Sequence, residues 1–361
     1  MKKKAKILSP VLLGLTLVIT GCTGNPQESK PETKQEQTKE QQTKPSAIQI
    51  QEVKPLNALT LQITFAEPLS KDEVDGSKLD EIKKSFAFDN GMSIVNVPQL
   101  KIGATSTYVV PVTIQKPGTT YTLSYNGGEK KTFAASDVKV GMNGTKQVTN
   151  DTFEIDSLQT DGVVDYANII EAYKAGRGDQ SFQVNDENKD ANGKQYQVIS
   201  SLRDREVTVT SDKGEAIVAK YVPFTQAADR RQAPKFRLPE GKLLTPGVKY
   251  TVSSDWATFK NPTFTAAQIT PLVMKSAEEI DDKSFQVTLD KDPGMELLAG
   301  RSVQLEAEDG SKVQAQYRFS SRKGAVGIFD VKDKTLKAGV KYKVVPTNNW
   351  ANADGVTLTA K

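Results

Sequence analysis

Histidine is absent from this chain of 361 residues, and cysteine occurs once, at Cys22. Without histidine the chain cannot form zinc sites of the Cys and His type, and it cannot use Ser-His-Asp or Cys-His catalysis. A single cysteine also excludes a disulfide within the chain. The sequence shows neither a Gly-rich phosphate loop nor a pair of carboxylates at a catalytic spacing. We therefore expect a protein that is not an enzyme.

An excess of charge of either sign is also missing from most of the chain. Four of the 48 basic residues are lysines at positions 2, 3, 4 and 6, which leaves 44 basic and 44 acidic residues in the rest. This balance gives no electrostatic reason to expect nucleic acid or an anionic membrane surface as a partner. After the N-terminal segment, no apolar run approaches the roughly 18 residues that a spanning helix needs.

The N-terminal segment has the parts of a secretory signal peptide. Its lysines precede an apolar run from Ile7 to Ile19, small residues and then Cys22, an order typical of a signal peptide rather than a spanning helix. The sequence Ile19-Thr-Gly-Cys22 resembles the lipobox of bacterial lipoproteins. The resemblance implies that residues 1–21 are removed and that the thiol of Cys22 carries a lipid, which makes the membrane a partner.

Residues 22–47 follow as a tether. The segment is rich in Lys, Glu, Gln, Thr and Pro and has almost no aliphatic residue. Such a sequence cannot bury enough apolar surface to offset the entropy of ordering, so we expect disorder. A lipid followed by a long tether favours the extracellular face of a Gram-positive cell membrane, where a thick wall has to be crossed. Gram-negative lipoproteins with linkers are the alternative.

Two short phrases then recur three times. The first phrase alternates apolar and polar residues, which is typical of a half-buried strand; it occurs at Leu59–Phe65, Phe153–Ile155 and Ser284–Leu289. The second phrase has a Gly followed three residues later by a Tyr; it occurs at Gly118–Leu123, Gly247–Val252 and Gly339–Val344. The Gly predicts a turn with positive φ, and the Tyr predicts a strand facing the core.

The distance between the two phrases is similar in the first and third units and longer in the middle unit. Units of this size with several short strands favour β-sandwiches. The phrases resemble those of the bacterial Ig-like domains of S-layer and other surface proteins, of the SbsA-type or Big-type. We therefore predict an all-β protein with tandem Ig-like sandwiches, the middle one with insertions. Its predicted domains are 48–136, 137–269 and 270–361.

The first insertion of the middle unit predicts a short helix. Tyr166, Ile169, Ile170 and Tyr173 would form one apolar stripe, with Asp165 as an N-cap and Gly176 as a stop. This helix either covers one end of the sandwich or contacts a partner.

A run of oxygen-bearing residues follows the predicted helix. Asp186, Asn188 and Asp190 alternate as ligands do in calcium loops, but the spacing of an EF-hand is not met. We expect a polar hairpin turn at Asn192-Gly193 in type I′ geometry, with weak calcium binding as the alternative. No other cofactor is expected.

Two sets of residues predict ligand binding. The second insertion combines basic residues with Phe and Pro, which could contact an anionic wall polymer or an acidic partner; the basic residues are Arg230, Arg231, Lys235 and Arg237. Trp256 and Trp350 occupy matching places after the second phrase. They predict either core packing or a platform on which sugar rings stack.

These features predict a lipid-anchored surface protein that binds a cell-wall polymer or an envelope protein through its middle domain. Two alternatives stay open at this point. The chain could be a passive structural spacer or scaffold, or it could be an accessory subunit of a membrane-bound enzyme or transporter.

Overall fold

Strands are the dominant regular structure of the chain, as the sequence predicts for an all-β protein. A computed structural model describes residues 48–156, 162–165, 184–223, 233–294 and 298–361. The signal peptide, the lipobox and the tether lie outside these ranges. Among the described residues, no helix is long and apolar enough to cross a membrane.

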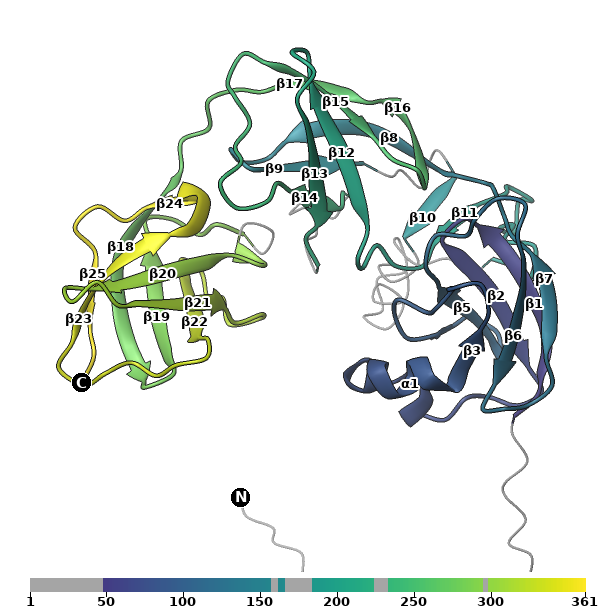
Figure 1. Cartoon of the computed structure of the whole chain (residues 1–361). Coiled ribbons are helices and arrows are strands. Elements are labelled where there is room, and N and C mark those ends of the chain that lie inside the picture. Colours follow the sequence, from purple (N-terminus) through teal and green to yellow (C-terminus); the bar gives the residue numbers. More distant parts are fainter. Residues whose placement is uncertain (1–47, 157–161, 166–183, 224–232, 295–297) are drawn as a thin grey trace, which may run out of the picture. The chain divides into compact units, whose positions relative to one another are not determined.

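The described strands form three groups with separate sheets, which we call modules 1, 2 and 3 (Figure 1). The strands of module 1 lie between Ile50 and Ala134, those of module 2 between Val140 and Thr265, and those of module 3 between Leu272 and Thr359. Each module has its own cluster of buried apolar side chains. The alternating strands supply these clusters; in β19 (Ser284–Leu289), for example, Phe285, Val287 and Leu289 are buried.

Module 1 packs a four-stranded sheet, in the order β1-β2-β5-β4, against a three-stranded sheet, β3-β6-β7. Its strands are β1 (Ile50–Asn57), β2 (Thr60–Phe65), β3 (Phe86–Phe88), β4 (Gln99–Leu100), β5 (Thr107–Pro111), β6 (Thr120–Tyr125) and β7 (Lys131–Ala134). Two 3-10 turns, Asp72–Val74 and Gly76–Lys78, lead into helix α1 (Leu79–Ser85), which buries Leu79 and Ile82. The sequence analysis missed this helix.

Module 2 has an eight-stranded sheet in the order β16-β8-β9-β14-β13-β12-β15-β17. Its strands are β8 (Val140–Gln147), β9 (Thr152–Ile155), β12 (Glu206–Ser211), β13 (Ala216–Tyr221), β14 (Lys235–Arg237), β15 (Lys249–Ser253), β16 (Ala257–Asn261) and β17 (Thr263–Thr265). A parallel pair, β10 (Val163–Asp165) and β11 (Gln197–Ile199), belongs to the first insertion. The helix predicted from Asp165 to Gly176 lies outside the described residues beyond its first position.

Module 3 repeats the strand order of module 2, strand for strand, as β24-β18-β19-β22-β21-β20-β23-β25. Its elements are β18 (Leu272–Asp281), β19, β20 (Ser302–Ala307), β21 (Lys312–Tyr317), β22 (Val326–Val331), β23 (Lys341–Pro346), a 3-10 turn (Thr347–Asn349), β24 (Ala351–Asn352) and β25 (Thr357–Thr359). The end strand β25 lies against β18, and β17 lies against β8. Each sheet therefore wraps around one core like a sandwich.

The second repeated phrase has the same structure in all three modules. Its glycines, Gly118, Gly247 and Gly339, have φ of +74°, +82° and +75°, which confirms the predicted turn. The three tyrosines that follow are buried, and each hydroxyl accepts a hydrogen bond from the backbone N–H five residues earlier at 3.0–3.1 Å. The tyrosine of this phrase therefore stabilises the turn before each strand.

Candidate functional site

The basic residues of the second insertion do not form one exposed cluster. Arg230 and Arg231 lie outside the described residues. Lys235 is fully buried on β14, where its Nζ lies 3.1 Å from Glu154 Oε2 and donates to Ala233 O at 3.1 Å. Lys235 and Glu154 are direct cross-strand neighbours of β14 and β9. Because a buried charge requires a partner, the lysine holds two strands together, and the expectation of a polymer contact at this residue is corrected.

Arg237 lies two residues further on and also points into the protein. Its Nε donates to Thr152 Oγ1 at 3.0 Å, and its Nη1 donates to the carbonyl of Ala299, in module 3, at 2.8 Å. Burial, together with the nearby Arg301 guanidinium, lowers the pKa of Arg237 to about 9, although Asp151 acts in the opposite direction. Arg237 thus contacts another module rather than a wall polymer.

The two tryptophans are core residues. Trp256 is 0% exposed and Trp350 is 7% exposed. Trp256 stacks on Phe236, and Trp350 stacks on Phe329. Each indole Nε1 donates to a backbone carbonyl, that of Glu206 at 2.8 Å and that of Ser302 at 2.9 Å. Because each ring is buried, stacked on a Phe and bonded through its N–H, neither ring offers a platform for a sugar, and packing is the interpretation that holds.

The residues predicted to bind calcium lie in a loop in which the carboxylate of Asp190 accepts hydrogen bonds from the loop itself. Asp190 Oδ1 accepts the backbone N–H groups of Asn192 and Lys194, both at 2.9 Å, and Tyr196 donates to Oδ2 at 3.3 Å. The Oδ1 of Asn188 is buried without a hydrogen-bond partner, and Asp186 lines a neighbouring groove. Within the described ranges, no three His, Cys, Asp or Glu side chains lie close enough to share a metal ion. Calcium binding here stays a prediction.

The turn that ends this loop differs from the predicted one. Gly193 has φ +78°, but Asn192 is not in the left-handed region, whereas a type I′ turn needs positive φ at both central residues. The N–H of Gly193 donates to Asp190 O at 2.9 Å, so the turn begins one residue earlier than expected. The carboxylate of Asp190 sets it by accepting the N–H of Asn192, a habit of Asp and Asn in turns.

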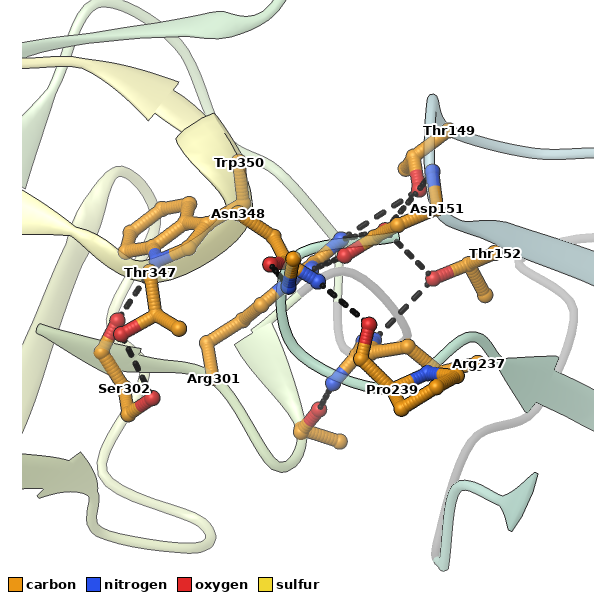
Figure 2. Close-up of polar contacts among 12 residues, drawn as sticks. Thr149, Asp151, Thr152, Arg237, Pro239, Arg301, Ser302, Thr347, Asn348 and Trp350 are labelled. Carbon is orange, nitrogen blue, oxygen red and sulfur yellow. Dashed lines mark hydrogen bonds and ion pairs between the residues drawn. The ribbon is translucent and has the colours of Figure 1, made fainter. Parts of the chain in front are cut away.

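Two deeply buried charged side chains, Asp151 and Arg301, meet where module 2 contacts module 3. Figure 2 shows the centre, where Arg301 forms a two-point ion pair with Asp151. Nη1 lies 2.6 Å from Oδ2, and Nη2 lies 2.9 Å from Oδ1. The side chains of Asp151 and Arg301 are 2% and 4% exposed. The turn between β8 and β9 carries Asp151, and Arg301 directly precedes β20. We call the residues of this contact joint 2–3.

Two hydroxyl groups complete the surroundings of Asp151. Thr149 Oγ1 and Thr152 Oγ1 lie 2.7 and 2.9 Å from Oδ1. Burial by itself would raise the pKa of this carboxyl, but the charge and hydrogen bonds of Arg301, the charge of Arg237 and the Thr149 hydroxyl lower it to about 2. Asp151 is therefore a permanent anion at neutral pH, paired with the Arg301 guanidinium and influenced by the charge of Arg237.

Two asparagine side chains form further hydrogen bonds at joint 2–3. Asn348, at φ 55°, accepts the N–H of Gly241 at 2.6 Å through Oδ1 and donates from Nδ2 to Pro239 O at 3.2 Å (Figure 2). Asn150 in turn donates to Ile269 O at 2.8 Å and accepts its N–H at 3.2 Å. Ile269 lies in the segment that connects the two modules, so the connection itself is tied to module 2.

The contact between modules 1 and 2, which we call joint 1–2, is built mainly from neutral groups. Asn57 Nδ2 donates to Val198 O at 2.8 Å, and the hydroxyls of Thr60 and Ser200 lie 3.0 Å apart. A buried guanidinium also crosses this joint, since Arg205 Nη2 donates to the carbonyl of Val112.

Joint 1–2 also contains a buried lysine beside a surface groove. Lys101 Nζ donates to Gln62 Oε1 at 2.9 Å and to Asn185 O at 2.5 Å. Burial lowers the pKa of Lys101 to about 8, and Asp186 nearby limits the shift. The groove has a volume of ≈ 700 Å³, and its lining includes Lys101, Lys189, Asp186 and Asp190. These charges balance, so the groove has no preference for a ligand of one sign.

Sequence reasoning missed the central residues of both joints. Asp151 stands in a turn without a motif, and Arg301 and Arg205 have only one signal. Each arginine comes three residues after a leucine, Leu298 and Leu202, and directly before an alternating strand. Comparing the second and third units residue by residue would have revealed this repeat.

Comparisons with known proteins add no family to this picture. No protein-family model matches the chain, and no curated protein matches it. Among solved structures, the chain resembles the S-layer protein rSbsC(31-844) with 11% identity and a TM-score of 0.19, and domains 1–6 of the surface layer protein SbsC with 12% identity and a TM-score of 0.19. Each match covers 86% of this chain and 54% of the other, so the chain spans about half the length of those S-layer chains.

A third match is to three domains of titin, A168-A170, at 9% identity and a TM-score of 0.15; it covers 87% of this chain and 97% of the titin chain. Scores this low carry no functional argument. The assignment of an all-β fold with sandwich-like sheets rests on the strand order and the cores described above.

Proposed function

We propose that this chain is a non-enzymatic lipoprotein of the outer cell surface that works as a structural spacer or scaffold. Its lipid on Cys22 would hold it in the membrane, and its three modules would carry the C-terminal part away from the bilayer. The observation that carries the proposal is the use of the candidate ligand residues. Lys235, Arg237, Trp256 and Trp350 are all engaged in strand pairing, cores or joint 2–3.

This placement supports the spacer over the binding protein that the sequence favours first. A binding surface needs exposed polar or aromatic groups that are not already paired. The described candidates are instead paired inside the protein, and one of them, Arg237, contacts the next module. A scaffold requires such internal contacts because it must transmit position and force along the chain.

A second function stays open because of the groove beside Lys101. This groove, lined by residues of modules 1 and 2, would hold an envelope polymer or protein partner. Arg230 and Arg231, outside the described residues, stay predicted contacts of the same function. The accessory-subunit alternative would use the same surfaces, so one experiment can separate the three functions.

The test is a pull-down with the full lipidated chain in detergent, carrying a C-terminal tag, against purified cell wall and solubilised membrane proteins of its host. The spacer predicts no retention on wall and no stoichiometric partner. Wall retention that is lost in Arg230→Glu/Arg231→Glu but kept in the control Lys332→Glu/Lys334→Glu would replace the spacer by the binding protein. One dominant membrane partner would replace it by the accessory subunit.

The anchor is tested separately by cell fractionation. The wild-type chain is expected in the membrane fraction, and Cys22→Ala is expected in the soluble fraction or the medium. Equal membrane retention of both chains would contradict lipid anchoring.

A further inference from the structure

The two buried arginines of the joints stand at equivalent places in modules 2 and 3. The segments Leu202–Tyr221 and Leu298–Tyr317 align without a gap at a spacing of 96 residues, which brings Arg205 onto Arg301. The backbone confirms the match. Each arginine N–H donates to the carbonyl of the leucine three residues before it at 3.0 Å, and each arginine carbonyl accepts the N–H of the aligned tyrosine at 2.9 Å.

The tryptophans hold both arginines in the same way. Trp256 Nε1 donates to the carbonyl of Glu206, and Trp350 Nε1 donates to the carbonyl of Ser302. Glu206 and Ser302 are the residues directly after Arg205 and Arg301. Each tryptophan therefore fixes the start of the strand from which the arginine leaves.

Both side chains then leave their own module and end in the preceding one. Arg205 donates to Val112 O in module 1, and Arg301 pairs with Asp151 in module 2. Each arginine is 4% exposed. Burying a guanidinium is costly unless a partner satisfies it, and in both cases the preceding module supplies a partner.

Module 1 lacks the arginine. Its strand β3 pairs with β6 as β12 pairs with β15 and β20 with β23, so the equivalent position lies just before Phe86. Lys84 and Ser85 stand there, and Lys84 is exposed. In the described chain, the buried arginine is thus found in the two modules that have another module in front of them.

We propose that Arg205 and Arg301 have one repeated role, which is to couple each module to the module before it. We call the contact of such an arginine with the preceding module a latch. Closing the latch buries the guanidinium against the preceding module, and opening it returns the charge to water. Local opening in the preceding module is therefore tied to the state of an arginine that belongs to the following module. The latch does not depend on the lipid anchor or on any partner, so its failure would leave the proposed function standing.

The test is hydrogen exchange, followed by mass spectrometry, on the full chain. Arg301→Gln should speed exchange in the turn between β8 and β9, in module 2, by roughly tenfold or more, because the turn loses its buried partner. The matched control is Arg318→Gln, which breaks an exposed two-point pair with Asp330 inside module 3. It should leave exchange in module 2 unchanged.

The first latch is tested by Arg205→Gln, which should speed exchange around Val112 in module 1 and leave module 3 unchanged. If a variant fails to fold, Asp151→Asn opens joint 2–3 from the other side without removing an arginine. A purely structural arginine would disturb only its own module. Exchange changes confined to the mutated module would overturn the proposal, as would an equal effect of Arg318→Gln.

Discussion

Joint 1–2 and joint 2–3 each contain an equivalent arginine, Arg205 or Arg301, but the groups around the two side chains differ. In joint 1–2, Arg205 meets a neutral carbonyl, its Nε is buried without a partner, and burial lowers its pKa to about 10. In joint 2–3, both ends of the Arg301 guanidinium meet the carboxylate of Asp151. The comparison teaches that one repeated position can serve a weaker, neutral contact or a stronger, ionic contact, depending on what the preceding module offers.

The largest expected effect comes from removing the carboxylate of joint 2–3. Asp151→Ala leaves Arg301 and Arg237 buried together without an anion, which should cost about 3–5 kcal/mol of unfolding free energy. Urea unfolding followed by tryptophan fluorescence measures it. Arg318→Ala, which breaks an exposed pair, should cost less than ~1 kcal/mol. Similar losses for the two variants would mean that the buried pair is no stronger than a surface pair.

The second prediction is that acid weakens joint 2–3 through protonation of Asp151. The pKa of Asp151 is lowered from 3.8 to about 2, so the unfolded chain binds this proton more readily than the folded chain. The stability it contributes is complete above about pH 4, and about 2 kcal/mol is lost as the pH falls towards 2. Thermal unfolding from pH 5 to pH 2 measures the loss. Asp151→Asn should remove that part of the pH dependence, and an unchanged profile would contradict the lowered pKa.

The third prediction concerns what the two joints share. Trp256→Phe and Trp350→Phe each leave a carbonyl, that of Glu206 or Ser302, without its indole donor. Each should cost about 1–3 kcal/mol, and the two losses should be similar because the hydrogen bonds have the same geometry. Urea unfolding of both variants checks this. If one costs much more than the other, the two tryptophans do not play one repeated role.

The fourth prediction concerns alkaline pH in joint 1–2. The pKa of Lys101 is lowered from 10.5 to about 8, so the unfolded chain holds this proton more tightly. Stability should therefore rise as the pH increases from about 8 towards 10.5, the same direction of pH dependence that Asp151 gives joint 2–3 between about pH 2 and pH 4. The measurement is the melting temperature of wild type minus that of Lys101→Met across this range. A difference that does not change with pH would remove the prediction.

Much of the fold could be predicted from the sequence because the repeated phrases are local. The alternation of Ser284–Leu289 gives the strand directly, and Gly339 with Tyr342 gives the turn and the strand after it. These signals depend on backbone geometry and on burial of one face. Helix α1 escaped prediction because its apolar face consists of only Leu79 and Ile82, too short a pattern to stand out.

The candidate site could not be predicted in the same way. Lys235 and Arg237 look like surface charges in the sequence, because composition does not reveal that Glu154 lies opposite Lys235 or that Thr152 lies opposite Arg237. Those partners are brought close by strand pairing, which depends on distant parts of the chain. The sequence places Trp256 and Trp350 at matching positions, but their hydrogen bonds to the starts of β12 and β20 could be seen only in the structure.

The central claim is that the buried charges of module 2 join modules, and a double-mutant cycle between Asp151 and Arg301 tests it most directly. Asp151→Ala, Arg301→Ala and the double variant are compared with wild type by urea unfolding of the full chain. The predicted result is a coupling energy above ~2 kcal/mol, because each single variant leaves the other charge buried and unpaired. Additivity within ~0.5 kcal/mol would show that the two residues act independently, and it would contradict the account of joint 2–3.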